Sequence, residues 1–441
     1  MSRNDAYCDN YNTKTCRFLC SIKPYTCYFA LQVMQALIIC NAESPELEQL
    51  TIQGSASLLP LGNETVLARL MSIFILSEIS DITIVHNKAQ TIRLTNYLNE
   101  NRQLWPDYMK VNLRELPNFY SLSETLQRIR SSITSNYLFI TYSNTVISEI
   151  DLRDIFLTMI RKKASVVAVF STLPATESKL FKSIPSELTV TTNDHSTLIS
   201  YVPASDVKKQ SKLSKNLSSQ QTILCRSDLR DCGLYLVSRA ALDHVAKLGE
   251  DITHRKRSIW QYFWSEPPEI NQEANGESDE KFETNNIKNY IECYQTGGTC
   301  IHEHRDKIIS VKFEDPLIYA ETNRLIIQKS CSHTGSQQSG KEFNIIRENC
   351  TVHKKAFIRS SFVGSSCKIG SDVRILNSVL LSNVEIRDNC TVQGCVIGEK
   401  AVIEELCNLK SCTVAAIQRV PTGTNLESKQ LGFTDPELNA T

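Results

Sequence analysis

A repeat of aliphatic residues constrains the fold of this chain more than any other feature. Between residues 346 and 414 an aliphatic side chain recurs at steps of six, six and five residues, so the pattern closes every 17 residues. A helix needs recurrence near 3.6 residues and a single strand near two, so neither explains it. The repeat predicts a solenoid whose coils have three short faces, each pointing one aliphatic side chain inward. The thirteen inward positions are Ile346, Val352, Ile358, Val363, Ile369, Ile375, Leu380, Ile386, Val392, Ile397, Ile403, Leu409 and Val414.

Small residues occupy the position two before each inward residue, and only Asn344 departs from this rule. A tight corner between faces leaves no room for large side chains, which explains the preference. Six of the 16 cysteines stand at these corners: Cys350, Cys367, Cys390, Cys395, Cys407 and Cys412. Because free cysteine behaves as a small buried hydrophobe, we expect these six to be reduced corner residues rather than ligands or disulfides.

The repeat resembles the left-handed parallel β-helix of hexapeptide-repeat proteins. We place the β-helix at 341–420 and interpret 421–441 as a tail. Many proteins with this repeat are acyltransferases that use a histidine near the coils. Here His353 is the one histidine inside the repeat and stands beside two lysines, so we expect a solvated surface residue and find acyl transfer weakly supported. Outward charges such as Glu399 and Glu404 are expected to form a solubilising face.

Composition and length limit the remaining possibilities. A chain of 441 residues is expected to hold two or three domains. Its 48 basic and 48 acidic side chains cancel, whereas proteins that bind nucleic acid through net charge are basic, so we expect no direct nucleic-acid binding. No run of about 18 apolar residues is present, so no membrane contact is expected.

The first 33 residues do not read as a secretory signal. Lys23 and Pro24 interrupt the apolar stretch that such a signal needs. We interpret 1–33 as a disordered extension. With no signal and at least six cysteines explained as reduced, we expect the protein to be cytosolic.

Between residues 34 and 330, strand-like apolar runs alternate with amphipathic stretches. Predicted strands lie at 36–40, 82–86, 137–141, 165–170, 233–237 and 308–312, and predicted helices at 66–78 and 124–133. Such alternation is typical of an α/β domain with a largely parallel sheet. Two inserts interrupt it: one at 205–220 is rich in lysine and serine, and one at 265–284 carries seven acidic residues against one lysine. Both are expected to be mobile surface loops.

Four short stretches of this region resemble the sugar-nucleotide pyrophosphorylase superfamily of nucleotidyltransferases. They are 34–39 (MQALII), 58–63 (LLPLGN), 137–140 (YLFI) and 232–237 (CGLYLV). In the superfamily the corresponding motifs form the opening strand, a proline-leucine turn, the strand before a metal-binding carboxylate, and a later strand. The resemblance implies an α/β, Rossmann-like nucleotidyltransferase domain over 34–330, followed by the left-handed parallel β-helix of hexapeptide repeats.

The reaction of that superfamily needs three features that this sequence lacks. They are a glycine-rich loop that approaches the triphosphate, a basic residue before the turn, and a carboxylate that holds magnesium. Here the loop position 40–46 reads CNAESPE, Ser57 replaces the lysine and Ser143 stands in the carboxylate position. The comparison with the superfamily therefore implies no catalytic, cofactor-binding or metal-binding residues and no cofactor. A regulatory pocket for a nucleotide or sugar phosphate around Asn41, Ser57 and Ser143 stays open.

A chain with this fold but without the catalytic residues resembles one branch of the superfamily. That branch contains the gamma and epsilon subunits of eukaryotic translation initiation factor 2B, a guanine nucleotide exchange factor for initiation factor 2. Met34-Gln35 and the stretch 319–324 (YAETNR) resemble gamma-type chains. Epsilon ends in a further helical domain, whereas 421–441 has no helical periodicity, which favours gamma. The resemblance implies a subunit that pairs with and supports epsilon, beside alpha, beta and delta subunits and initiation factor 2. The alternative is a sugar-nucleotide pyrophosphorylase or its regulatory subunit.

Overall fold

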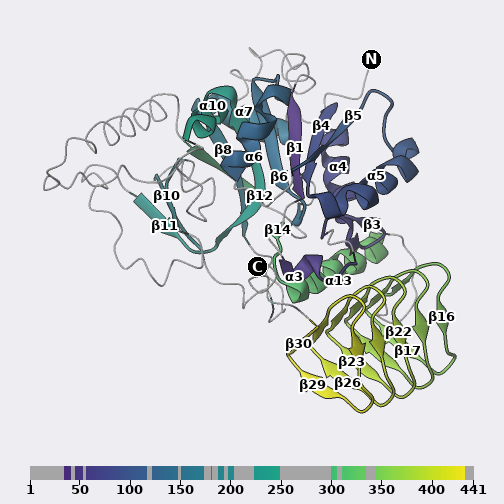
Figure 1. Ribbon diagram of the computed structural model, residues 1–441. Coiled ribbons are helices and arrows are strands. Elements are labelled where there is room, and N and C mark those ends of the chain that lie inside the picture. Colours follow the sequence, from purple (N-terminus) through teal and green to yellow (C-terminus); the bar gives the residue numbers. More distant parts are fainter. Residues whose placement is uncertain are drawn as a thin grey trace, which may run out of the picture.

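The chain forms a sheet-centred N-terminal part and a C-terminal β-helix, with helix α13 (Pro316–His333) lying between them (Figure 1). The computed structural model describes residues 34–40, 45–52, 56–116, 122–147, 150–172, 180, 187–192, 197–202, 223–248, 299–304, 310–333 and 343–432. The predicted extension 1–33 and the predicted loops at 205–220 and 265–284 lie outside these residues.

A seven-stranded sheet forms the centre of the N-terminal part. In spatial order it contains β13 (Thr299–His304), β8 (Val166–Thr172), β12 (Leu229–Ser238), β6 (Tyr137–Tyr142), β1 (Gln35–Cys40), β4 (Asp81–His86) and β5 (Lys110–Glu115). β12 runs antiparallel to both of its neighbours, and the other neighbouring pairs are parallel. The central strands read as continuous apolar runs because both faces of the sheet are covered.

Helices cover the two faces of this sheet. They are α4 (Val66–Leu76), α5 (Thr91–Glu100), α6 (Leu122–Ile129), α7 (Leu152–Lys162) and α10 (Arg239–Leu248). Along β1, Ala36 and Ile38 share a core with α4, α5 and α7. Leu37 and Ile39, which point to the opposite face, share a core with α6 and α10. The alternation of side chains along one strand therefore separates the two cores.

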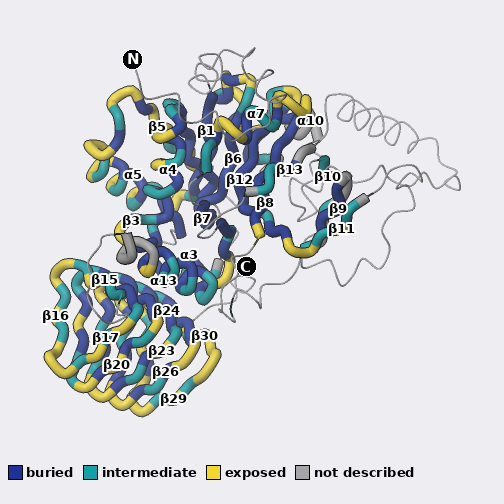
Figure 2. Tube along the Cα trace, turned by 180° about the vertical axis from the view of Figure 1, so that it is seen from behind, coloured by how far each residue is buried: buried dark blue, intermediate teal, exposed yellow. Residues whose placement is uncertain are grey.

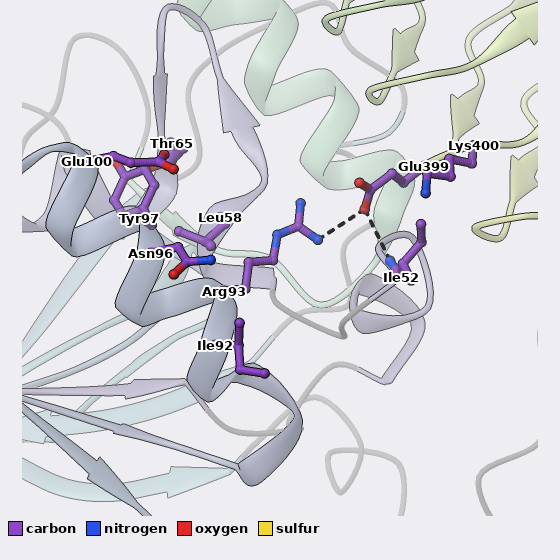
Figure 3. Close-up of a pocket in the computed structure, with 10 residues that line it drawn as sticks. All are labelled: Ile52, Leu58, Thr65, Ile92, Arg93, Asn96, Tyr97, Glu100, Glu399 and Lys400. Atoms are coloured by element: carbon purple, nitrogen blue, oxygen red, sulfur yellow. Dashed lines mark hydrogen bonds and ion pairs between the residues drawn. The ribbon is translucent and has the colours of Figure 1, made fainter.

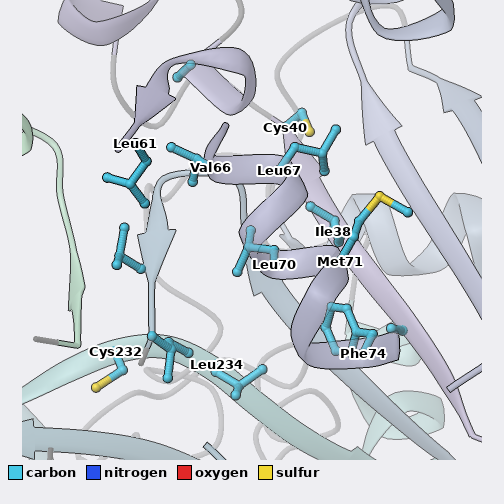
Figure 4. Packing of buried hydrophobic residues seen from close by; sticks show 14 of the residues in the cluster. Ile38, Cys40, Leu61, Val66, Leu67, Leu70, Met71, Phe74, Cys232 and Leu234 are labelled. Atoms are coloured by element: carbon cyan, nitrogen blue, oxygen red, sulfur yellow. The ribbon is translucent and has the colours of Figure 1, made fainter. Parts of the chain in front are cut away.

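Helix α4 shows how the sequence positions one of these layers. The Thr65 hydroxyl accepts a hydrogen bond from the Ala68 N–H at 3.1 Å and caps the helix. The sequence also predicts that Leu67, Leu70, Met71, Phe74 and Ile75 form one apolar face of this helix. All but Ile75, which is half-buried, are buried, and Figure 4 shows the buried side chains lying against β1. The helix ends at Leu76, two residues before the predicted end.

Smaller strands flank the main sheet. The described part of the predicted strand at 308–312 is the short β14 (Val311–Lys312), which pairs with β7 (Thr145–Val146) instead of joining the main sheet. A separate three-stranded sheet contains β10 (Leu198–Val202), β9 (Leu188–Thr192) and β11 (Ile223–Arg226). These strands extend the N-terminal part away from the β-helix (Figure 1).

The β-helix is built from three parallel sheets. The first contains β15 (Ile345–Ile346), β18 (Phe362–Val363), β21 (Val379–Leu380), β24 (Val396–Ile397), β27 (Thr413–Val414) and β30 (Gln430–Leu431). The second contains β16 (Thr351–Val352), β19 (Lys368–Ile369), β22 (Glu385–Ile386), β25 (Val402–Ile403) and β28 (Arg419–Val420). The third contains β17 (Phe357–Arg359), β20 (Arg374–Leu376), β23 (Thr391–Gln393), β26 (Asn408–Lys410) and β29 (Asn425–Glu427).

The registers of these sheets confirm the predicted 17-residue repeat. Ile346 pairs with Val363 and Val363 with Leu380, so aliphatic side chains stack into columns. Ten of the thirteen predicted inward residues are buried, and the three that are less buried belong to the first coil. The arrangement fits a left-handed β-helix. It also extends past the predicted boundary, because Leu426 and Leu431 continue two of the columns, so residues 421–431 belong to the β-helix and not to a tail.

The corner cysteines are free, as predicted, and five of the six are buried. Their thiols make a regular ladder in which Cys367 donates to the Leu381 carbonyl at 3.1 Å and Cys390 to the Glu404 carbonyl at 2.9 Å. Asn344 is the one larger residue among the corner positions. Like these thiols, it donates a hydrogen bond to a backbone carbonyl, from its amide nitrogen to Ile358 at 2.8 Å. The corner therefore accommodates a side-chain donor as well as a small apolar side chain.

The four middle strands of the first sheet, β18, β21, β24 and β27, are buried on both sides. Their inward residues form the coil core, whereas Phe362, Val379 and Val396 belong to the core shared with the N-terminal part. Backbone bonds strengthen this contact, since the Glu399 N–H donates to the Leu50 carbonyl and the Ala416 N–H to the Gln49 carbonyl, both at 2.8 Å. The β-helix is therefore docked on the N-terminal part along one of its three faces.

Candidate functional site

The carboxyl ends of β1 and β6 are the natural place to look for a ligand site, because open α/β sheets bind ligands there. β1 ends at Cys40, and Ser143 follows β6, with its N–H donating to the Ile39 carbonyl at 2.9 Å. Asn41 and the rest of the loop to residue 44 lie outside the residues that the structure describes. Of the predicted pocket, the structure therefore places Ser57 and Ser143.

The structure brings Ser57 and Ser143 together at the Cys40 thiol. All three residues are buried, and both serine side chains hydrogen-bond the thiol. Burial raises the pKa of Cys40 to about 12, and the two serine hydrogen bonds offset only part of that effect. At neutral pH this set is therefore a neutral thiol between two neutral hydroxyls. Such a set neither neutralises a triphosphate nor supplies the hard anionic oxygen that magnesium prefers.

A carboxyl group that the sequence patterns did not reveal lies beside this set. Glu48 ends the short helix α3 (Pro45–Glu48), and burial raises its pKa to about 7. It acts electrostatically on Cys40, and the Gln90 amide donates to its Oε1 at 3.4 Å. When ionised, Glu48 would repel a phosphate group. Within the described ranges, no group of three or more His, Cys, Asp or Glu side chains is placed to hold a metal ion.

A second arrangement joins two of the stretches that carry the resemblance, 58–63 and 319–324. The turn after η2 (Ala56–Leu58) contains β2 (Pro60–Leu61) and β3 (Glu64–Thr65). The Tyr319 hydroxyl donates to the Pro60 carbonyl at 2.6 Å, and the Asn323 amide nitrogen donates to the same carbonyl at 3.1 Å. The Gly62 N–H in turn donates to Asn323 Oδ1 at 2.7 Å. Gly62 has a φ of +64°, a left-handed conformation that favours glycine.

The remaining charged residues of that stretch pair with each other. Arg324 holds Glu321 through two hydrogen bonds of 2.8 Å, one from Nε and one from Nη2. Tyr319 and Asn323 are fully buried, and burial raises the pKa of Tyr319. Side chains of the stretch 319–324 on α13 therefore hold the turn at 60–62 in place. In sequence, α13 precedes the β-helix. We call this arrangement the turn lock (Tyr319, Asn323, Pro60 and Gly62).

A cleft of about 460 Å³ opens between α5 and the β-helix (Figure 3). Glu399 lines this cleft, where it accepts hydrogen bonds from Arg93 Nη1 at 3.0 Å and from the Ile52 N–H at 3.2 Å. The solubilising role predicted for Glu399 is therefore wrong, because this side chain ties the two parts of the chain together. The cleft is lined by Ile52, Leu58, Thr65, Ile92, Arg93, Asn96, Tyr97, Glu100, Glu399 and Lys400.

Glu404 also departs from the predicted solubilising face. Its carboxylate is largely buried on the second sheet of the β-helix, where it accepts from Arg387 Nη1 at 2.6 Å and also pairs with Arg419. Burial without partners would be costly for a carboxylate, so the two arginines account for its position. His353, by contrast, is exposed in the first coil as predicted.

Comparison with known proteins supports a family for the β-helix. The family model described as the EIF2B subunit epsilon LbH domain matches residues 323–426, a range that starts at Asn323 of the turn lock and ends in β29. The match covers about a quarter of the chain and supports a relation of its β-helix to the EIF2B family. It does not separate the gamma from the epsilon subunit. A search among curated proteins found no significant match. Within the part of the chain that the structure describes, no helix is long and apolar enough to cross a membrane.

Proposed function

We propose that this chain is a non-catalytic, gamma-type subunit of the EIF2B guanine nucleotide exchange complex. Its role would be to pair with and support an epsilon-type subunit during GDP/GTP exchange on initiation factor 2. The observation that carries the proposal is the family-model match over 323–426. The choice of gamma over epsilon rests on the resemblance at Met34-Gln35 and at 319–324. The further partners proposed are the alpha, beta and delta subunits, and the proposed location is the cytosol.

We also propose that the sheet-centred part is a Rossmann-like nucleotidyltransferase domain that has lost its reaction. Cys40, Ser57 and Ser143 support this, because these three described side chains at the ends of β1 and β6 are neutral and offer no charge to phosphate or magnesium. The raised pKa of Glu48 adds a group that binds a proton near neutrality, not a phosphate. An active sugar-nucleotide pyrophosphorylase would need the opposite chemistry at this edge of the sheet.

Affinity purification tests the assignment. A tagged copy is purified from its own cells, and the eluate is analysed by mass spectrometry beside a tagged β-helix protein of unrelated function. We expect an epsilon-type chain in near-equal amount, together with alpha, beta and delta subunits and initiation factor 2. Recovery of the chain alone, or with an active pyrophosphorylase, would contradict the proposal.

A turnover assay tests the loss of the reaction independently. The purified chain is mixed with magnesium, nucleoside triphosphates and sugar 1-phosphates, and released pyrophosphate is measured. We expect no release above that of a heat-denatured sample. Magnesium-dependent release that falls in the Ser143→Ala variant would show that the domain is an enzyme, whatever its partners are.

A further inference from the structure

The first coil leaves one end of the β-helix open. β15, β16 and β17 are the outermost strands of the three sheets, and no strand described in the structure pairs with their outer edges. Figure 2 shows these strands together at one end of the β-helix. The inward side chain of Ile346 is 47% exposed there, whereas its stacking partner Val363 is fully buried. The aliphatic columns of the coil are therefore uncovered at this end.

Basic side chains gather beside the open coil. Lys354 and Lys355 form the corner before β17, Arg359 ends β17, and Arg374 lies opposite Phe357 in the next coil. All are exposed, and Phe357 among them is 45% exposed. We call these five residues the basic end. Lys355 makes a long ion pair with Asp372 at 3.9 Å, and Lys354, Arg359 and Arg374 make none within the described part of the chain.

Several charged side chains elsewhere on the β-helix form ion pairs within the chain. Arg387 and Arg419 both bind Glu404, and Glu399 binds Arg93. These arginines are paired within the chain, whereas Lys354, Arg359 and Arg374 of the basic end have no ion-pair partner among the described residues. Positive charge is also concentrated near the open coil: residues 343–376 carry six Lys or Arg against two Asp or Glu, and residues 377–432 carry five against six. An excess of unpaired cations around an uncovered aliphatic end is unusual for a free surface, because strand edges and apolar ends are normally covered.

We propose that the basic end and the open first coil bind an acidic segment of another protein that also carries aliphatic residues. Its carboxylates would meet Lys354, Arg359 and Arg374, and its aliphatic side chains would continue the columns that end at the first coil. A nucleic acid fits less well, because phosphates and bases offer no aliphatic side chains to cover the exposed end of the columns. This inference does not rest on the proposed function.

Fluorescence anisotropy with the full chain tests this surface. The probe is a labelled twelve-residue peptide in which glutamate and valine alternate. Comparison probes replace each glutamate by lysine or each valine by serine, and a fourth probe is a twelve-nucleotide single-stranded DNA. We expect binding of the glutamate-valine peptide that weakens with salt, weaker binding of the glutamate-serine peptide, and none of the lysine peptide.

Two matched variants locate the binding. Arg359→Glu with Arg374→Glu reverses two cations of the basic end, and Lys410→Glu with Lys429→Glu reverses two exposed cations of later coils. The first pair should raise the Kd on the order of tenfold, and the second should leave it unchanged. Equal binding by both variants, no binding to the unmodified chain, or tighter binding of the DNA would each overturn the proposal. Equal thermal midpoints show that the variants are folded.

Discussion

At the scale of single residues, the buried carboxyl of Glu48 gives the N-terminal part a pH dependence. Burial raises its pKa from 4.5 to about 7, so between these values the folded chain binds a proton that the unfolded chain has released. Stability contributed by the protonated form is therefore complete below about pH 4.5 and lost as the pH rises through 7. Glu187, whose pKa burial also raises to about 7, adds a parallel contribution.

We predict that Glu48→Gln makes the chain more stable than the unmodified protein at pH 8 and flattens the fall in stability between pH 5 and 8. The contribution of Glu187 remains in both proteins, so the difference between them isolates Glu48. Urea unfolding at several pH values measures it, with Glu405→Gln, at an exposed corner, as the control. A pH profile that Glu48→Gln leaves unchanged would contradict the account of this residue.

Ile417 gives a second prediction at this scale. It is 63% exposed and has a φ of +65°, a left-handed conformation that is costly for a β-branched residue. Ile417→Asn should therefore stabilise the chain by about 1 kcal/mol. Gly423 occupies a similar corner with a φ of +73° and open space around it, so Gly423→Ala should destabilise by a similar amount. The same sign for both variants would show that corner conformation does not control stability.

At the scale of elements, the turn lock ties the turn at 60–62 to α13. Asn323→Ala would remove both bonds of its side chain to this turn and leave the Gly62 N–H without its partner. We expect a loss of about 2–3 kcal/mol in the free energy of unfolding. Arg324→Ala, which breaks a more exposed ion pair one residue away, should cost less than about 1 kcal/mol. If urea unfolding showed equal losses of stability for Asn323→Ala and Arg324→Ala, the hydrogen bonds of Asn323 to the turn would not account for the effect.

The same elements show what the sequence predicts well. The β-helix follows from it because each inward residue repeats at fixed spacing, and Leu426 was missed only because the count stopped at Val414. β5 was missed because it is an edge strand with an exposed, polar pattern, Lys110 to Glu115. The direction of β12 depends on tertiary pairing with β6 and β8, which no local pattern encodes.

The candidate site was predictable only in part. Ser57 and Ser143 were singled out by the motifs around them, and the structure places both at the Cys40 thiol. Glu48 was missed because its raised pKa comes from burial, which depends on how α3 packs and not on its neighbours in sequence. Glu399 was misjudged for a similar reason, since its partner Arg93 is far away along the chain.

At the scale of the whole molecule, the β-helix uses one face to dock on the N-terminal part and leaves the strands of its second and third sheets outside this shared core. Arg93 and Ile52 bind Glu399 of the β-helix, and the turn lock fixes the N-terminal part to α13. Such an arrangement suits a chain that presents surfaces to other subunits. In the proposed complex, nucleotide exchange is performed by the epsilon-type partner and this chain supports it.

The release of labelled GDP from initiation factor 2 tests that division of roles most directly. Release is measured with the epsilon-type subunit alone, with this chain alone, and with both together. We predict no acceleration by this chain alone and faster release by the pair than by the epsilon-type subunit alone. Acceleration by this chain alone, or a pair no faster than the epsilon-type subunit, would contradict the supporting role.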